Sequence, residues 1–156
     1  MERTLLVIKP DGVARGLVGD ILSRLERKGI FITALKLMKL DEEKARALYS
    51  VHVGRSFYEP LIAYITSGAL VACIAEGQGV IRMVRNIAGP TFGSDAAGGT
   101  IRGDLAVSKR FNIVHASDST ESFNREYPVF FTDDEIVDLP PERLNWIYDT
   151  SGDEIV

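Results

Sequence analysis

Hydrophobic side chains along this chain gather in four short, nearly continuous runs, each bounded by glycine, proline or charged residues. The runs cover residues 3–9, 30–40, 69–75 and 112–117. Apolar runs of this length are typical of strands that are covered on both faces. The pattern therefore predicts a four-stranded sheet with protein packed on either side.

Between these runs the apolar positions recur at helical spacing. Val18, Ile21, Leu22 and Leu25 form one such stripe, and Gly29 is well placed to end that helix. The segment PDGVARG, ahead of the stripe, is predicted to be a break without regular structure. The other predicted helices are one that Asp41 caps, one over 57–66 that Gly68 ends, one over 79–89, and one that Asp118 opens and that runs to about Arg125.

The order of these elements predicts the fold class. Four strands joined through two crossover helices fit an α/β (α+β) sandwich of the ferredoxin-like βαββαβ kind, with a mixed, mostly antiparallel sheet covered by helices. At 156 residues the chain is most simply one domain with a sizeable core.

The composition limits the class of protein but does not indicate a function. The chain is 46% hydrophobic and 26% charged, which is ordinary for a globular protein. It contains neither the roughly 20-residue apolar stretch of a membrane span nor a secretory signal. Cys73 is the only cysteine, so an intrachain disulfide is excluded and a small buried residue is expected there. These features favour a cytoplasmic protein that does not associate with membranes.

Charge is distributed unevenly. Residues 126–156 hold nine acidic side chains and one basic side chain, a net of −8, whereas residues 1–125 carry a net of +4. A mildly basic body favours a phosphorylated ligand, and the acidic tail argues against a specific affinity for nucleic acid. The tail also carries Trp146, Ile147 and Tyr148, so we expect it to fray or to pack, on its own or a neighbouring subunit.

The segment AGPTFGSDAAGGTIRGD, residues 88–104, has five glycines in 17 residues. Loops of this length inside a compact domain are usually functional, and glycine lets a backbone bend closely around a ligand. Thr91, Thr100 and Arg102 offer donors suited to phosphate oxygens. No GxxxxGK(S/T) loop and no GxGxxG after the first strand occurs, so phosphate would be held by dispersed cations and hydroxyls. A disordered surface loop is the alternative.

One of only two histidines, His115, lies inside the fourth predicted strand, in FNIVHASDS. From this stretch alone, a hydrogen-bonded core histidine and a reactive histidine are equally acceptable. Lys9, Arg85 and Tyr49, each taken singly, are also ordinary residues.

Four segments together resemble the nucleoside diphosphate kinase family. VIKPDGVARGLVG, YITSG and GTIRGD match family segments in the correct order, and NIVHASDS matches the signature NxxH(G/A)SDS. The resemblance runs from Met1 to about Phe131. It implies a catalytic domain over 1–132 and an acidic C-terminal extension over 133–156.

The resemblance implies a ping-pong reaction in which His115 accepts the γ-phosphate of a nucleoside triphosphate, typically ATP, and passes it to a diphosphate. Glu126 would orient the imidazole and Ser117 would support that glutamate, while Tyr49 would lie beside the transferred group. The residues implied to bind the nucleotide are Lys9, Arg85, Thr91 and Arg102 at the phosphates, Lys9 and Asn112 at the ribose, and Phe57 at the base. Asp118 would hold Mg²⁺, through water.

The implied partners are nucleoside di- and triphosphates, including ATP, GTP, NDPs and dNDPs. A base that is only stacked is not selected strongly, which predicts broad specificity. The family also implies a homo-oligomer, a hexamer or a tetramer. A non-catalytic relative that binds nucleotide or regulates is the main alternative, and a phosphohistidine carrier or a small-metabolite regulatory domain are others.

Departures from the family pattern concern the glycine-rich segment and the residues after it. Phe92 and Gly93 stand where members carry Asn-Pro or Asp-Pro after the threonine, and the pair Gly98-Gly99 occupies the region where a proline is common. Losing prolines is expected to loosen the loop. Lys109 replaces a small apolar residue near the base, which predicts altered base contacts.

Overall fold

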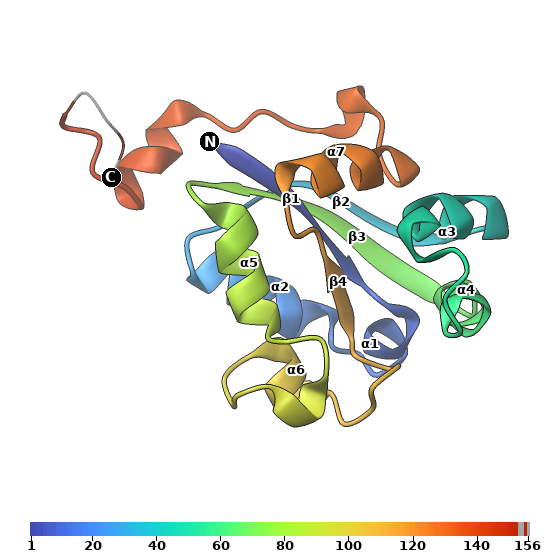
Figure 1. The fold of residues 1–156 in the computed structure, drawn as a ribbon. Coiled ribbons are helices and arrows are strands. Elements are labelled where there is room, and N and C mark those ends of the chain that lie inside the picture. Colours follow the sequence, from blue (N-terminus) through green and yellow to red (C-terminus); the bar gives the residue numbers. More distant parts are fainter. Residues whose placement is uncertain (153–154, 156) are drawn as a thin grey trace.

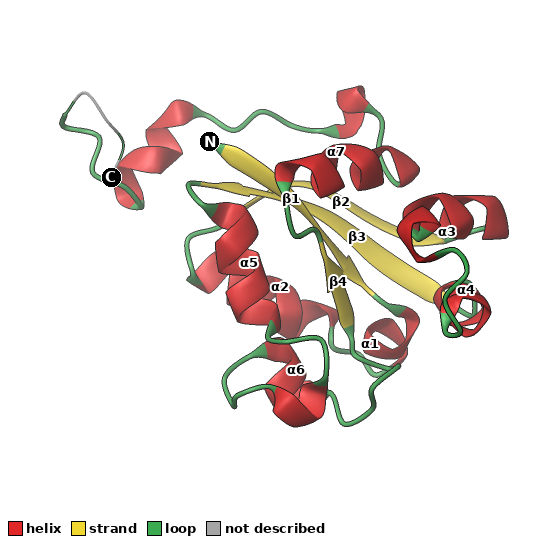
Figure 2. Ribbon diagram, in the orientation of Figure 1, coloured by secondary structure: helices red, strands yellow, loops and turns green. Residues whose placement is uncertain are grey.

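A computed structural model describes residues 1–152 and 155 of the chain. It contains one four-stranded sheet in the order β2-β3-β1-β4 (Figures 1 and 2). The strands are β1 (Glu2–Ile8), β2 (Phe31–Lys39), β3 (Ala69–Gly77) and β4 (Val114–Ala116). All three pairings are antiparallel, so the expected ferredoxin-like order is confirmed but the expected mixture of directions is wrong. Each crossover helix carries the chain past one strand position before it re-enters the sheet, so neighbouring strands run in opposite directions.

Helices cover both faces of the sheet (Figure 1). One face carries α2 (Val18–Arg27) and α5 (Val80–Ala88), and the other carries α3 (Glu42–Leu48) and α7 (Thr120–Glu126). The remaining helices are α1 (Pro10–Ala14), α4 (Tyr58–Ile65) and α6 (Ile101–Leu105). None of the described helices is long and apolar enough to cross a membrane.

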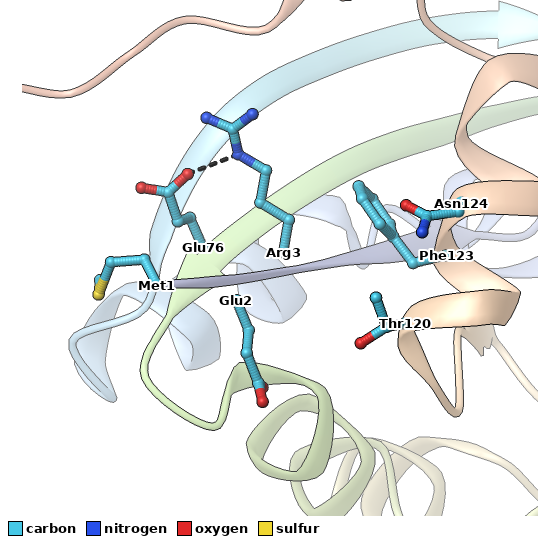
Figure 3. Close-up of a pocket in the computed structure, with 7 residues that line it drawn as sticks. All are labelled: Met1, Glu2, Arg3, Glu76, Thr120, Phe123 and Asn124. Atoms are coloured by element: carbon cyan, nitrogen blue, oxygen red, sulfur yellow. Dashed lines mark hydrogen bonds and ion pairs between the residues drawn. The ribbon is translucent and has the colours of Figure 1, made fainter.

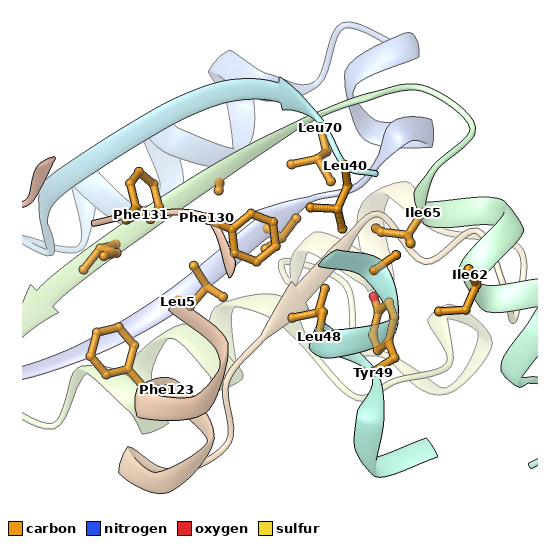
Figure 4. Packing of buried hydrophobic residues seen from close by; sticks show 14 of the residues in the cluster. Leu5, Leu40, Leu48, Tyr49, Ile62, Ile65, Leu70, Phe123, Phe130 and Phe131 are labelled. Carbon is orange, nitrogen blue, oxygen red and sulfur yellow. The ribbon is translucent and has the colours of Figure 1, made fainter. Parts of the chain in front are cut away.

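The central strand β1 shows why its sequence lacks alternation. Leu5 and Val7 pack in the cluster under α3 and α7, whereas Leu6 and Ile8 pack in the cluster under α2 and α5, and all four are fully buried. Figure 4 shows the first cluster, in which Leu5 lies near the phenyl ring of Phe123. Because both faces are covered here, the run Leu5–Ile8 is apolar at every position.

Two short helices lie in segments predicted to be irregular. The segment after β1 forms α1, with Pro10 at its first position, where the missing N–H costs no hydrogen bond. The glycine-rich segment contains a 3₁₀ turn (Gly93–Asp95) and α6, whose N-cap Thr100 accepts the Gly103 N–H at 3.0 Å. Glycines interrupt the helical pattern of both segments, so the sequence did not predict these helices.

Other expectations changed only at element boundaries. The cap of α7 is Ser119, which accepts the Ser122 N–H at 3.1 Å, and Asp118 precedes the helix. β4 has only three residues, fewer than the apolar run suggested. The Asp41 cap of α3 is confirmed by its bond from the Lys44 N–H at 2.8 Å.

The described part of the C-terminal tail packs on its own chain. The Val137 N–H donates to the Thr33 carbonyl on β2 at 2.8 Å. Further along, Ile147 lies against Gly29, and the hydroxyl of Tyr148 accepts the Gln78 N–H at 3.0 Å. Trp146 is 90% exposed. Residues 153, 154 and 156 of the acidic tail lie outside the described residues.

Candidate active site

A pocket of about 540 Å³ opens beside the start of β4, where the β1–α1 junction, the glycine-rich segment and α7 converge. This volume suits a small ligand. The family resemblance implied eleven site residues, and ten of them line this pocket: Lys9, Tyr49, Phe57, Arg85, Thr91, Arg102, Asn112, His115, Asp118 and Glu126. The eleventh, Ser117, lies behind Glu126. Thr100, a further candidate phosphate donor, caps α6 and is not among the lining residues. Tertiary structure therefore brings together residues from five regions of the chain.

His115 is held by one ring nitrogen. Its Nε2 lies 2.9 Å from the Glu126 Oε2, and the Ser117 hydroxyl donates to the same oxygen at 2.6 Å. Burial alone would raise the pKa of the Glu126 carboxyl, but the hydrogen bond and charge of His115, with the Ser117 bond, outweigh burial and keep this pKa below its ordinary value. A carboxylate at Nε2 fixes the tautomer and leaves Nδ1 as the nitrogen with a lone pair.

Tyr49 packs edge-on against the histidine. The two ring centroids are 5.9 Å apart at an interplanar angle of 90°. The Tyr49 hydroxyl is buried and has no hydrogen-bond partner among the described residues. Burial, followed by the charge of Glu126, raises its pKa, so the hydroxyl remains a neutral donor. A buried donor of this kind is costly unless a ligand atom satisfies it.

Two buried cations lie at the inner end of the pocket. Lys9 Nζ donates to Asn112 Oδ1 at 2.7 Å, and burial, then repulsion from Arg102, lower its pKa to about 8. Arg102 donates to the carbonyls of Asn112, Gly89 and Val114 at 3.2, 2.8 and 2.7 Å. Burial, then the charge of Arg85, lower the Arg102 pKa to about 10.

Neither Lys9 nor Arg102 has a carboxylate ion-pair partner within the described chain. Burying charge without a counter-ion is unfavourable, and a bound anion would offset that cost. Arg85 reaches the same region, with its Nη1 3.4 Å from the Ala116 carbonyl. The inner pocket is therefore suited to an anion with several oxygens.

Aromatic side chains lie at the outer part of the pocket. Phe57 and Phe92 are each 44% exposed. The Phe57 ring packs edge-on against the His52 ring, with the two centroids 5.3 Å apart. Lys109 Nζ lies 5.7 Å from the centroid of the Phe92 ring. Exposed aromatic faces beside a cationic inner pocket match a flat ring joined to a phosphate chain. His52 lies in a 3₁₀ turn that follows α3, at the pocket wall.

Asp118 is the carboxylate at this pocket that is best placed for a metal. Its Oδ1 accepts the Ser122 hydroxyl at 2.5 Å, and this bond lowers its pKa against the opposing effect of burial. Both oxygens of Glu126, in contrast, contact protein groups. No group of three or more His, Cys, Asp or Glu in the described residues forms a metal cage. One carboxylate suits a magnesium ion that takes its other oxygen ligands from phosphate and water.

Sequence patterns missed several lining residues. Ser122 and Arg125 reach the pocket from α7, four and seven positions after Asp118, a helical spacing that the sequence did contain. Val51, Leu61 and Arg110 had no such signal.

A second hollow lies at the other end of β1 (Figure 3). It is lined by Met1, Glu2, Arg3, Glu76, Thr120, Phe123 and Asn124. Its one cationic side chain, Arg3, is paired with Glu76 at 2.6 Å, and Figure 3 shows this ion pair as a dashed line. The hollow lacks the unpaired cations and the histidine of the first pocket.

The fold is an antiparallel α+β sandwich. Its pocket contains a histidine held by a carboxylate, cations without carboxylate partners and an aromatic mouth. Together these features define a nucleotide phosphotransferase. The family model "Nucleoside diphosphate kinase" matches residues 2–136. The nucleoside diphosphate kinase of Staphylothermus marinus is 57% identical over 137 residues, covering 88% of this chain and 97% of the relative. That of Thermoplasma volcanium is 47% identical and covers all of this chain and 99% of the relative.

Solved structures agree with these matches. A halophilic nucleoside diphosphate kinase from Halobacterium salinarum, in complex with CDP, superposes with a TM-score of 0.92 at 43% identity, covering 95% of this chain and 99% of that chain. The chain belongs to the nucleoside diphosphate kinase family. It is an enzyme, a nucleoside-diphosphate kinase, and the alternative of a non-catalytic relative is not supported. The family uses a divalent cation and nucleotide substrates.

Proposed function

We propose that this enzyme works by a ping-pong mechanism through a phosphohistidine on His115. The single observation that carries the proposal is the bond that holds Nε2 of His115, which leaves Nδ1 as the available ring nitrogen in the pocket that Lys9 and Arg102 also line. In the first half-reaction the Nδ1 lone pair forms a bond to the γ-phosphorus of a nucleoside triphosphate. The bond from that phosphorus to the bridging oxygen breaks, and its electron pair leaves with the nucleoside diphosphate. A different diphosphate then reverses these steps.

Electrostatic stabilisation supplies the acceleration. Glu126 stabilises the positive imidazole ring that forms as Nδ1 attacks, in the way that the aspartate serves a hydrolase triad. Arg85, Arg102 and Lys9 stabilise the negative charge of the phosphoryl oxygens, and Thr91 adds donors. The unsatisfied Tyr49 hydroxyl would donate to an oxygen of the transferred group.

We infer that the required divalent cation is Mg²⁺ and that Asp118 holds it through water. The ion would supply positive charge that neutralises part of the charge of the phosphates. The lowered pKa of Asp118 keeps this carboxylate charged throughout the neutral range.

Nucleotide binding follows the two parts of the pocket. Lys9 and Asn112 would contact the ribose hydroxyls, while Phe57 would stack on the base. The CDP complex of the Halobacterium salinarum relative supports nucleotide binding in this fold. We propose ATP as the usual donor, with GTP, NDPs and dNDPs also accepted.

We further propose a homo-oligomer, a hexamer or tetramer, in the cytoplasm. Leu35 and Leu37 on the edge strand β2 are 52% and 68% exposed, which supports association with another copy. Residues 1–132 would form the catalytic domain and 133–156 an extension packed on it or on a neighbouring subunit.

Acid-labile labelling tests the mechanism. Incubation with ATP labelled at the γ-phosphate and Mg²⁺ should label the protein at Nδ1 of His115, and any nucleoside diphosphate should remove the label. His115→Asn should abolish both steps, while His52→Asn, which changes the other histidine at the pocket wall, should still be labelled. Normal labelling of His115→Asn would refute the proposal.

A further inference from the structure

The backbone just before β4 adopts a conformation that β-branched residues avoid. Ile113 has a φ of 71°, and it is the one non-glycine residue with a positive φ in the described part of the chain. Across it, the Val114 N–H donates to the Asn112 carbonyl at 2.8 Å, the hydrogen-bond pattern of a γ-turn. Such conformations persist only where the surroundings hold them.

The segment after β1 supplies those surroundings. Asp11 Oδ2 accepts the Ile113 N–H at 3.1 Å, and the Lys9 N–H donates to the Ile113 carbonyl at 2.8 Å. Gly12 lies directly against the turn, since a Cβ there would be 3.3 Å from Ile113 Cγ2. Both backbone polar groups of Ile113 are thus satisfied by one short segment.

Asp11 is in turn held by α4. Its Oδ1 accepts the hydroxyl of Tyr64, which is 6% exposed. The Tyr64 ring packs on Phe111 with centroids 4.9 Å apart. Burial and the neighbouring Asp11 raise the pKa of the Tyr64 hydroxyl, so it stays a donor.

The turn presents a residue of the proposed sugar site. Asn112 Oδ1 accepts from Lys9 Nζ at 2.7 Å, and its Nδ2 donates to the Thr91 carbonyl at 2.9 Å. Asp11 and Tyr64 themselves are not among the residues that line the pocket. They can therefore affect a bound nucleotide through the turn and through Lys9, because the Lys9 Nζ lies 5.7 Å from the centroid of the Tyr64 ring and the charge of Asp11 acts on the same ammonium group.

We propose that Asp11, braced by Tyr64, is a positioning residue that fixes the Lys9–Asn112 pair for the ribose hydroxyls by holding the Ile113 turn. This inference rests on the proposed ribose contact of that pair. A loosened turn would let Asn112 and Lys9 separate, whereas Arg85 would keep its contact with the Ala116 carbonyl and Arg102 its bond to the Gly89 carbonyl, both outside the turn. The loss would then fall on the sugar and not uniformly on activity.

The readout is the preference for a 3′-hydroxyl. We would measure kcat/KM for dTDP and for its 2′,3′-dideoxy counterpart and take their ratio. Asp11→Asn removes the negative charge and puts an amide donor in place of one acceptor oxygen, so the Ile113 N–H and the Tyr64 hydroxyl lose their shared charged acceptor and the hydroxyl must turn to accept from the amide. The ratio should fall roughly tenfold in Asp11→Asn and roughly threefold in Tyr64→Phe, the usual effect of losing one buried hydrogen bond.

Matched controls make the same chemical changes elsewhere. Asp41→Asn alters a carboxylate that also accepts one backbone N–H, at 2.8 Å, at the far end of α3 from Tyr49. Tyr127→Phe removes a hydroxyl that also donates to an aspartate, at 2.9 Å. Both controls should keep the wild-type ratio, whatever their effect on thermal stability.

Asn112→Ala separates the inference from the proposal beneath it. If Asn112→Ala lowers the ratio but Asp11→Asn and Tyr64→Phe do not, the positioning role is wrong and the ribose contact stands. If Asn112→Ala also keeps the ratio, both are wrong. An equal fall in the control variants would likewise overturn the positioning role. Should Asp11→Asn fail to fold, Tyr64→Phe decides alone.

Discussion

Two pocket residues, Lys9 and Arg102, are cationic although no carboxylate of the described residues forms an ion pair with them. Lys9 is 6% exposed and Arg102 is 5% exposed, and their hydrogen bonds go to neutral oxygens. Desolvation lowers the pKa of both. The bound phosphate chain is the partner that would make their burial favourable.

The lowered pKa of Lys9 predicts an alkaline limit on activity. As pH rises through about 8, Lys9 loses its proton in the free enzyme, and kcat/KM should fall because a phosphate-binding charge disappears. Lys9→Arg keeps its charge above pH 10, so its decline should begin at higher pH. Profiles of kcat/KM from pH 6.5 to 10 compare the two, and identical midpoints would exclude Lys9 as the group.

Folding stability should respond to the same lysine with the opposite sign. The pKa in the folded state, about 8, lies below the ordinary value of 10.5. Between these values the unfolded chain binds more protons, so the Lys9 contribution to stability rises with pH across this window. Below pH 8 Lys9 is charged in both the folded and the unfolded state, so the full cost of burying its charge opposes folding.

Lys109 predicts a preference among bases. Its ammonium group can only donate hydrogen bonds. A guanine edge offers the two acceptors O6 and N7, whereas an adenine edge offers N7 beside an amino donor, so the lysine should favour guanine. The GDP to ADP ratio of kcat/KM should fall roughly threefold in Lys109→Val, a modest effect because the lysine is exposed. Lys44→Val, on exposed α3, is the control. An unchanged ratio in Lys109→Val would remove this role.

Among the secondary-structure elements, the glycine-rich segment is packed where the sequence suggested a loose loop. A Cβ on Gly93 would lie 2.3 Å from the Ala106 carbonyl oxygen, and one on Gly103 would lie 2.0 Å from that of Ala97. The Asp104 carboxylate accepts the Gly99 N–H at 2.8 Å and pairs with Arg24 at 2.7 Å. These contacts replace the restraint that prolines would have given, and they position Arg102 from α6.

A pair of alanine substitutions tests this packing. Gly103→Ala should lower the free energy of unfolding by about 1–3 kcal/mol, because the backbone of Ala97 must move. Gly98→Ala has open space at its Cβ and should be neutral or slightly stabilising. Denaturant unfolding compares them, and equal stabilities would show that the segment yields freely.

At the scale of the whole molecule, the tail runs along the edge strand β2 and then contacts the ends of α2 and β3. Besides the Val137 bond to β2, Arg143 stacks over the Phe31 ring at 5.1 Å, and Ile147 and Tyr148 contact the ends of α2 and β3. These contacts tie the tail to its own chain. They imply that the tail stabilises the fold of its own subunit.

A chain shortened to end at Asp138 tests that role. It should unfold at lower temperature, because the contacts of Ile147 and Tyr148 are lost, and it should keep its activity and its number of subunits. Thermal unfolding and sedimentation equilibrium of both lengths measure this. A smaller assembly for the short chain would show instead that the tail joins subunits.

The sequence by itself determined the sheet, the flanking helices and most of the polar residues that the pocket brings together. Both faces of the sheet are covered, so the strands appear as apolar runs, and residues that bind phosphate differ chemically from a core. The segment around His115 was recognisable because its signature is local. Ten predicted residues in one pocket show how far local patterns reached.

Tertiary structure decided the features that depend on contacts between distant segments. α1 and α6 escaped prediction because glycine and proline disfavour helix in isolation, and only packing fixes them. The Asp11–Ile113 bond joins positions 102 residues apart, and no local pattern encodes it. A left-handed isoleucine is unfavourable by itself, so its conformation follows from the groups that the fold places around it.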